Sequence, residues 1–191
     1  MQERNAYGNI VIPPFNYTTA EDTACEFLKG VKIKNFINVG FHGWSDIRKH
    51  WWINICNFNG IEWKIVEVYK PNVDNAISEG CPQSNIINLN IKHVSDLPDA
   101  DCLMFWHGPE HMEKDEFLQI LPLLEDKYRM LLFGMPLGPE PQGEAYGNPF
   151  EKHVSSWQEY EWRELGYEVR VVYKNRSWPH ITAWKINEGE E

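Results

Sequence analysis

The sequence predicts a single α/β domain in which a mostly parallel β-sheet is covered by helices on both faces. The first observation is that short apolar runs alternate with segments of helical apolar spacing along most of the 191 residues. The second is that these runs are apolar on both sides, which is typical of strands buried between helices. No internal repeat or second domain interrupts the pattern. We therefore expect an irregular arm over residues 1–19 and one domain over residues 20–191.

Seven short runs rich in apolar and β-branched residues are predicted to form the strands. They cover residues 36–39, 61–69, 85–89, 101–106, 128–133, 167–173 and 180–186. The first five alternate with helices and are expected to be parallel. The last two flank a turn-like segment and are expected to close the sheet as a pair.

Helical spacing of apolar residues predicts five helices next to these strands. They cover residues 19–28, 46–59, 71–80, 113–124 and 155–165. Thr18 or Thr19 is expected to cap the first, and glycines follow the ends of several of them. Pro122 is expected to distort the end of the fourth helix, and Ser155 or Ser156 to cap the fifth.

Composition and charge narrow the classes of function. The formal net charge is −10 and no basic stripe is present, so we expect no nucleic-acid partner. No apolar run approaches the length of a membrane-spanning helix and no apolar signal segment opens the sequence, so we expect a cytoplasmic protein without a membrane partner. The four cysteines are spread without metal-ligand spacing and are expected to be buried free thiols.

The carboxyl ends of the strands are where open α/β sheets bind their ligands. After the first strand, Gly40, His42 and Gly43 lie in a tight turn, where glycine lets the backbone approach a ligand. An ordinary βα turn has the same composition, and the spacing is not the G-x-G-x-x-G of dinucleotide enzymes. Near the end of the second strand, Glu67 lies among apolar neighbours, and its carboxylate can accept both hydroxyls of a ribose.

Polar residues also follow the third strand. Asn90 can hydrogen-bond an adenine edge with its side chain, while a backbone amide such as that of Ile91 pairs with a ring nitrogen. Asn88 is a competing candidate for the same contact. A plain polar strand end is an equally good interpretation of this segment.

The densest group of reactive side chains follows the fourth strand. Trp106, His107, Glu110 and His111 lie there around a Gly-Pro turn. An imidazole titrates near neutral pH and can act as a base. Helix capping by His111 and packing of His107 on Trp106 are the structural alternatives. Because a Gly-Pro pair between the two histidines prevents one smooth helical face, we expect no metal site.

A loop rich in glycine and proline covers residues 134–154. Loops of this length inside compact domains are usually functional. This one follows the fifth strand, so we expect it to hang over the same crevice and to select a substrate with Gln142, Asn148 and His153. The alternative is a structural Ω-loop held by its own side chains.

These features, in this order, resemble the class I S-adenosylmethionine-dependent methyltransferases over about residues 34–187. The turn that begins at Asn38 resembles the first motif of the family, and Glu67 matches the acidic residue that holds the cofactor ribose. The resemblance implies a Rossmann-like class I methyltransferase fold with a seven-stranded, mostly parallel sheet and an antiparallel last strand. It also implies S-adenosyl-L-methionine as the cofactor and a small molecule as the methyl acceptor.

The resemblance assigns roles to the residues at the strand ends. The implied cofactor-binding residues are Gly40, His42, Gly43, Glu67, Tyr69, Asn90, Ile91 and Trp106. The candidate bases are His107, His111 and His153, and the candidate substrate-binding residues are Glu110, Gln142 and Asn148. An aromatic ring such as that of Trp106 would face the sulfonium or stack on adenine.

The sequence departs from the family in its first motif. Asn38 stands where an acidic residue is usual, and His42 and Trp44 replace two of three glycines. The Asp/Asn-Pro-Pro-Tyr motif of nucleic-acid amino methyltransferases is absent, in agreement with the acidic charge. Three other interpretations stay open: a non-catalytic methyltransferase fold that binds a ligand or partner, a nicotinamide-dependent oxidoreductase, and a metal-dependent hydrolase built on the cluster after the fourth strand. The sequence leaves the oligomeric state open.

Overall fold

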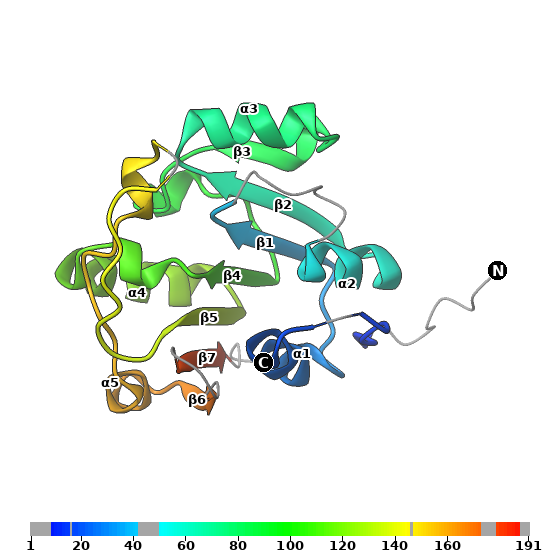
Figure 1. Cartoon of the computed structure of the whole chain (residues 1–191). Coiled ribbons are helices and arrows are strands. Elements are labelled where there is room, and N and C mark those ends of the chain that lie inside the picture. Colours follow the sequence, from blue (N-terminus) through cyan, green and yellow to red (C-terminus); the bar gives the residue numbers. More distant parts are fainter. Residues whose placement is uncertain (1–8, 16, 42–49, 146, 173–178, 188–191) are drawn as a thin grey trace.

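The computed structural model describes residues 9–15, 17–41, 50–145, 147–172 and 179–187, and contains one seven-stranded sheet in the order β3-β2-β1-β4-β5-β7-β6 (Figure 1). The strands are β1 (Asn35–Val39), β2 (Glu62–Glu67), β3 (Ile86–Asn88), β4 (Cys102–Trp106), β5 (Met130–Pro136), β6 (Glu168–Val172) and β7 (His180–Ile186). Strands β1 to β5 are parallel, and β7 is antiparallel to both of its neighbours, β5 and β6. The predicted fold class, with its closing antiparallel pair, is confirmed.

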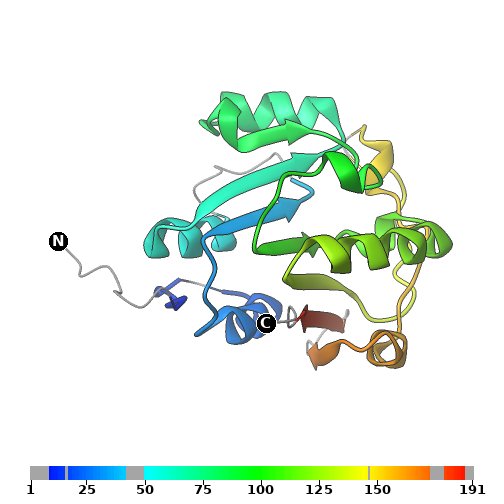
Figure 2. The same ribbon diagram turned by 180° about the vertical axis from the view of Figure 1, so that it is seen from behind.

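The helices cover both faces of the sheet. They are α1 (Thr19–Leu28), α2 (Trp51–Asn59), α3 (Lys70–Ser78), α4 (Lys114–Lys127) and α5 (Glu159–Glu164). Helices α1, α2 and α3 pack on one face, and α4 and α5 pack on the other. Figures 1 and 2, which view the molecule from opposite sides, show α2 in front of the sheet in one view and α4 in the other.

Alternation along each strand divides the core into two layers. Phe36 of β1 packs with the α1–α3 layer, whereas Ile37 packs with the α4–α5 layer. Ile37 lies beside Leu103 of β4, which lies beside Leu131 of β5, so one row of apolar side chains crosses three strands. A sheet buried on both faces leaves its strand ends as the place where polar groups can face a ligand.

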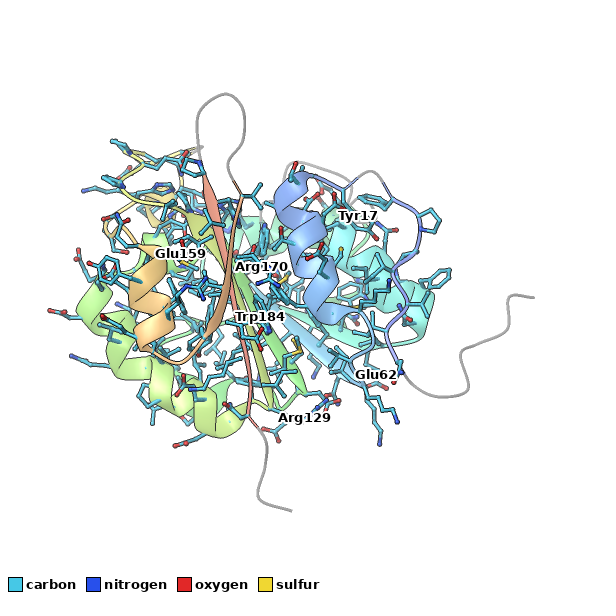
Figure 3. All side chains as sticks on the ribbon, turned by 90° about the horizontal axis from the view of Figure 1, so that it is seen from below. Tyr17, Glu62, Arg129, Glu159, Arg170 and Trp184 are labelled. Atoms are coloured by element: carbon cyan, nitrogen blue, oxygen red, sulfur yellow. The ribbon has the colours of Figure 1, made fainter. Side chains whose placement is uncertain are left out.

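Helix α1 lies against the antiparallel end of the sheet, as the view from below shows (Figure 3). Trp184 of β7 is 6% exposed and belongs to the same apolar layer as α1, and the Arg170 guanidinium of β6 lies 5.7 Å from the centre of its ring. Thr18 caps α1 through a capping box with Glu21, in agreement with the predicted helix start.

Two predicted helix boundaries in the second half are wrong. Pro122 lies inside α4, which continues to Lys127. Helix α5 begins after Gln158, whose side chain forms a capping box with Glu161, and not at Ser155 or Ser156. The hydroxyl of Ser155 instead donates to the carbonyl of Pro109, so this serine ties the loop to the end of β4.

Two predicted strand ends also differ. Strand β2 ends at Glu67 and not at Tyr69, because the Glu67 carboxylate accepts the backbone N–H of Tyr69 and turns the chain. Strand β5 extends to Pro136, because its last residues pair with β7 down to His180. The first difference arises from a contact within the turn, and the second from pairing with a distant strand.

The described part of the N-terminal arm packs onto the domain. Ile10 is buried and its N–H donates to Val31, while the N–H of Val11 donates to Asn59 at the end of α2. All four cysteines are buried free thiols, as predicted, and desolvation by burial raises the pKa of each thiol. No helix in the described residues is both long enough and apolar enough to cross a membrane.

Candidate active site

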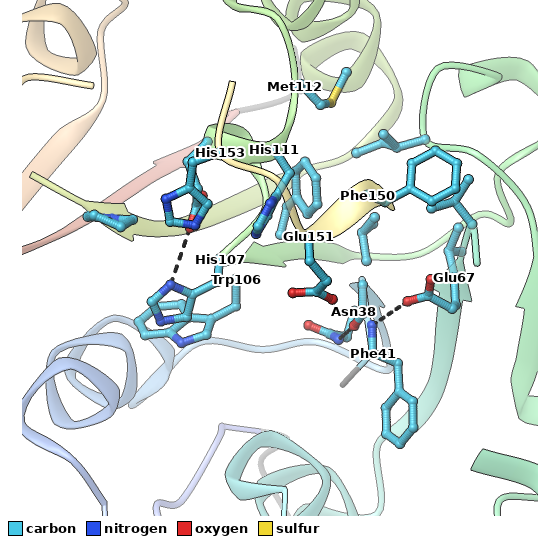
Figure 4. A pocket seen from close by; sticks show the side chains of 18 of the residues that line it. Asn38, Phe41, Glu67, Trp106, His107, His111, Met112, Phe150, Glu151 and His153 are labelled. Carbon is cyan, nitrogen blue, oxygen red and sulfur yellow. Dashed lines mark hydrogen bonds and ion pairs between the residues drawn. The ribbon is translucent and has the colours of Figure 1, made fainter. Parts of the chain in front are cut away.

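A cavity of about 910 Å³ opens at the carboxyl ends of the parallel strands (Figure 4). The sequence-predicted residues that line it are Gly40, Glu67, Asn90, Ile91, Trp106, His107, Glu110, His111, Gln142, Asn148 and His153. Tyr69 is not among the lining residues, and His42 and Gly43 lie outside the described residues. The fold therefore brings together side chains from the strand ends and from the long loop, which come from distant parts of the sequence.

Glu67 is the buried acid at the end of β2. Its side chain is 4% exposed, and its two carboxylate oxygens accept backbone N–H groups at 2.6 Å, one from Phe41 and one from Tyr69. Burial raises the pKa of Glu67 to about 7, although both hydrogen bonds act in the opposite direction. The carboxyl group is thus fixed in position next to the turn after β1 and is poised to gain or lose a proton near neutral pH.

The turn after β1 brings the backbone close to the cavity. Gly40 has a φ of 84°, a conformation that favours glycine, and a Cβ placed on it would project into open space. Asn38 donates from its side chain to the carbonyl of Gly40 at 2.6 Å. The other side-chain atom of Asn38, Oδ1, is buried and has no hydrogen-bond partner among the described residues. The turn therefore offers a ligand an unused buried acceptor.

The segment after β3 separates the two asparagine candidates. Asn88 donates its side-chain amide to the carbonyls of Glu67 and Val68, so it supports the end of β2 and does not line the cavity. Asn90 and Ile91 do line it. The Oδ1 atom of Asn90 accepts the N–H of Lys92, which leaves its amide group as the donor available to a ligand.

An aromatic platform lies at the end of β4. The ring of Trp106 lies 5.5 Å from that of Trp51 and 4.8 Å from that of His180, measured between ring centres. Gly134 of β5 makes room for it, because a Cβ there would lie 2.3 Å from the indole ring. His180 lines the cavity and was missed by the sequence analysis. The antiparallel direction of β7 could have indicated it, because the first residue of an antiparallel strand lies at the carboxyl edge of its parallel neighbours.

His107 has an unusual backbone conformation at the same strand end. Its φ is 51°, a value that is rare for residues other than glycine. Residues with such backbone conformations cluster at functional sites. Its N–H donates to the carbonyl of Gly134 at 2.7 Å, and its Nδ1 atom lies 3.3 Å from an oxygen of Glu110. Glu110 is 2% exposed, whereas the His107 side chain is 53% exposed. A buried carboxylate thus orients an imidazole that stays accessible from the cavity.

Glu110 and His111 meet His153 of the loop. One ligand atom from each of the three side chains lies within 4.8 Å of the others, and the centres of the two imidazole rings are 4.8 Å apart. Figure 4 shows His111 and His153 side by side. The N–H groups of Val154 and Ser155 both donate to the backbone carbonyl of Glu110. These two hydrogen bonds hold the end of the loop, with His153, next to Glu110. The sequence did not indicate that His153, and not His107, would join Glu110 and His111.

The remaining candidate residues of the loop mostly make hydrogen bonds within the loop and stabilise its conformation. Gln142 donates its side-chain amide to the carbonyl of Glu151 at 2.6 Å, and Asn148 caps the short turn at Pro149–Glu151. Tyr69 also belongs to this framework, because its hydroxyl donates to the carbonyl of Gly147 at 2.9 Å. Gln142 and Asn148 line the cavity, but these amide contacts belong to an Ω-type loop held by its own side chains.

The cavity is strongly acidic. Among its described lining residues are seven glutamates, Glu21, Glu67, Glu110, Glu113, Glu116, Glu140 and Glu151, but Lys92 is the lone lysine and arginine is absent. Lys92 is itself paired with Glu116. A concave site with this balance favours positively charged ligands and disfavours phosphates.

Comparison with solved structures identifies the fold. The methyltransferase domain of a bacterial CtHen1 protein is 16% identical, with a TM-score of 0.58 over 85% of this chain and 95% of that chain. A SAM-dependent methyltransferase from Aquifex aeolicus is 18% identical, with a TM-score of 0.51 over 87% and 89% of the two chains. The N-terminal domain of EvdMO1, solved in the presence of SAH and D-fucose, is 13% identical, with a TM-score of 0.55 over 91% and 85%.

The chain therefore has the class I methyltransferase fold, as its resemblance to that family implied. At these identities the likeness establishes the fold and not a shared substrate. No protein-family model and no curated protein sequence matches the chain.

Proposed function

We propose that this protein is an S-adenosylmethionine-dependent methyltransferase that acts on a small-molecule acceptor. The observation that carries the proposal is Glu67, a carboxylate buried at the carboxyl end of β2 on the wall of the cavity. A carboxylate at this place in an α/β sheet is suited to accept the hydroxyls of a ribose. The acidic cavity also suits the positive charge of a sulfonium group.

The residues beside Glu67 fit the other parts of the cofactor. The unused Oδ1 of Asn38 would accept from the ammonium group of the cofactor's methionine portion, close to the half-buried backbone of Gly40. The free amide of Asn90 and the backbone of Ile91 would contact the adenine edge. The missing acidic residue at position 38 is thus replaced by an amide oxygen, which is an acceptor without a full charge.

Bound S-adenosylmethionine supplies a methyl group that is already reactive. The tasks left to the chain are to hold the acceptor in line, to keep water away and to remove a proton from the acceptor. The platform of Trp106 and His180 and the segment that carries His153 surround the space where an acceptor would lie. We place the acceptor between this platform and the loop.

His107 is the proposed base. Its Nδ1 atom lies 3.3 Å from a buried carboxylate oxygen of Glu110, an arrangement that orients an imidazole beside the cavity. His111 and His153 differ, because their Nδ1 atoms face backbone carbonyls of Lys152 and Glu140. A carboxylate partner stabilises the imidazolium formed in catalysis better than a carbonyl does.

Calorimetric titration with S-adenosylmethionine and S-adenosylhomocysteine tests the proposal. Glu67→Ala should weaken binding by at least about 100-fold, because two charge-assisted hydrogen bonds to the ribose are lost. Glu62→Ala is the matched control, since Glu62 is the exposed first residue of the same strand. Glu67→Gln keeps the volume of the side chain and should also bind weakly, and thermal melts verify that each variant is folded.

Two results would contradict this function. If the wild-type chain does not bind either ligand at millimolar concentration, the cofactor assignment fails and a binding protein without catalysis becomes the better interpretation. If Glu67→Ala and Glu67→Gln bind as tightly as Glu62→Ala, the cofactor does not use the end of β2. Stabilisation by NAD(H) or NADP(H) in place of S-adenosylmethionine would instead favour an oxidoreductase.

A further inference from the structure

The cluster of Glu110, His111 and His153 has the composition and spacing of a cation site. One donor atom from each residue lies within 4.8 Å of the others. Around a bound metal with ligands at about 2.1 Å, two donor atoms are separated by about 3.3 Å. Small rotations of the side chains would therefore be enough to bring the three donors onto one ion.

A buried carboxylate oxygen is left unused in this cluster. One oxygen of Glu110 faces His107 at 3.3 Å. The other, Oε2, is buried and has no hydrogen-bond partner among the described residues. A buried carboxylate oxygen without a partner is costly for the fold, and a cation is the ligand that compensates it best.

The hydrogen bonds of the two imidazoles suit metal ligands. His153 Nδ1 lies 2.6 Å from the carbonyl of Glu140, and His111 Nδ1 lies 3.2 Å from the carbonyl of Lys152. A carbonyl only accepts, so each Nδ1 carries the proton and each Nε2 keeps its lone pair. Hydrogen bonds of this kind commonly fix the tautomer and the orientation of metal-binding histidines.

We propose that Glu110, His111 and His153 bind a divalent first-row transition-metal ion, such as Zn²⁺ or Mn²⁺, on the loop side of the cavity. Two imidazoles and one carboxylate favour such ions over Mg²⁺ or Ca²⁺, which prefer oxygen ligands alone. The expectation of no metal site rested on the pairing of His107 with His111. The structure pairs His111 with His153 instead, so the Gly-Pro turn is no obstacle.

Three protein ligands leave coordination positions open toward the cavity. On the basis of the proposed function, these positions would hold an oxygen of the methyl acceptor, which points to a hydroxyl-bearing substrate. The ion would make that hydroxyl more acidic, which favours its deprotonation. Metal binding itself does not depend on the cofactor and can be measured without it.

The test is titration of the full chain, purified without a histidine tag and stripped with chelator, with Zn²⁺, Mn²⁺ and Mg²⁺. We expect one equivalent of Zn²⁺ or Mn²⁺ to bind with at least about 10-fold preference over Mg²⁺. The variants Glu110→Gln, His111→Gln and His153→Gln should each weaken binding by at least about 100-fold. The visible absorption of bound Co²⁺ should change in parallel.

His93→Gln is the matched control, because His93 is exposed and does not line the cavity. It should bind metal like the wild-type chain. The inference is overturned if the wild-type chain binds no stoichiometric ion, or if the ligand variants bind as tightly as His93→Gln. S-adenosylhomocysteine binding is measured on the same metal-free samples, because the proposed cofactor contacts of Glu67 need no metal. Cofactor binding without metal binding would contradict only the metal site, and loss of cofactor binding would contradict the proposed function.

Discussion

The two sides of the cavity hold their carboxylates in different ways. On the cofactor side, formed by the ends of β1, β2 and β3, both oxygens of Glu67 accept backbone N–H groups from neighbouring segments. On the loop side, formed by the end of β4 and residues 137–145 and 147–157, Glu110 has one oxygen beside His107 and one with no partner among the described residues. Both carboxyl groups are almost completely buried.

This difference indicates different tasks. A carboxylate held by backbone amides is fixed before a ligand arrives, and it can still accept hydroxyl groups with its remaining lone pairs. A buried oxygen without a hydrogen-bond donor instead needs a ligand to supply its partner. The carboxylate of the cofactor side is therefore preformed, whereas that of the loop side would be completed by the proposed cation.

The largest expected change in stability concerns the platform between the two sides. In Gly134→Ala, the added Cβ would lie 2.3 Å from the ring of Trp106, which is flanked by Trp51 and His180. Overpacking of this kind should lower the free energy of unfolding by about 1–3 kcal/mol. Calorimetric melting measures the loss, as a shift of about 2–4 °C per kcal/mol in a chain of this size.

Gly143→Ala is the control for this change, because a Cβ at Gly143 meets nothing within 4 Å. It should melt within about 0.5 kcal/mol of the wild-type chain. Equal melting temperatures for the two variants would mean that Trp106 can move freely. The aromatic platform under the loop side could then rearrange to fit a ligand. This would increase the contrast with the cofactor side, where Glu67 is held in place by backbone N–H groups.

The sequence predicted the fold well because the strong signals were local. Continuous apolar runs and glycines at helix ends located the strands and most helix ends, as at Gly60 after α2. Two of the errors occurred where a distant contact decided the boundary. The hydroxyl of Ser155 donates a hydrogen bond to the carbonyl of Pro109 and does not cap α5. Strand β5 is longer than predicted because it pairs with β7.

Site residues that a local sequence pattern marks were predicted, whereas groupings that depend on distant contacts were not. Glu67 was singled out from its place at the end of an apolar run, although only one of its two partners, Tyr69, is close in sequence, and the other, Phe41, is not. By contrast, His153 meets Glu110 and His111 only because backbone bonds fix the loop on β4, which no sequence spacing reveals. His180 escaped notice because it depends on the position of β7 within the sheet.

The next effect concerns the pH dependence of cofactor binding. Because burial raises the pKa of Glu67 to about 7, a large fraction of the protein carries a neutral Glu67 carboxyl group at pH 6. The ionised form accepts ribose hydroxyls better, so affinity for S-adenosylhomocysteine should rise by up to about 10-fold between pH 6 and pH 8. Calorimetry at three pH values measures this rise, and the uncharged sulfide avoids an added attraction between a sulfonium and the ionised carboxylates.

The Glu67→Gln variant should bind weakly and without this pH dependence, because it has no carboxyl group to titrate. The same raised pKa means that the contribution of Glu67 to the stability of the free fold is fully present below the ordinary glutamate pKa and is lost as the pH rises through about 7. Affinity that is constant or falls with rising pH would mean that Glu67 is already ionised at pH 6. The cofactor side would then be more fully preformed than the structure implies.

The smallest expected effect concerns the link between the two sides. The hydroxyl of Tyr69, next to the Glu67 turn, donates to the carbonyl of Gly147 in the loop. Tyr69→Phe removes this bond and should cost about 1 kcal/mol locally. Hydrogen exchange of residues 139–145 and 147–154 should become about fivefold faster, while the core strands exchange as before.

Tyr160→Phe is the control, because Tyr160 is 61% exposed on α5 and lies away from the cavity. If Tyr69→Phe accelerates exchange near Gly147 but not near His153, the bonds to Glu110 hold the ligand end of the loop on their own. The two sides would then be independent, and removal of the cation should leave cofactor affinity unchanged. If exchange accelerates along the whole loop, Tyr69 couples the sides, and by linkage each ligand should change the affinity of the other by the same factor.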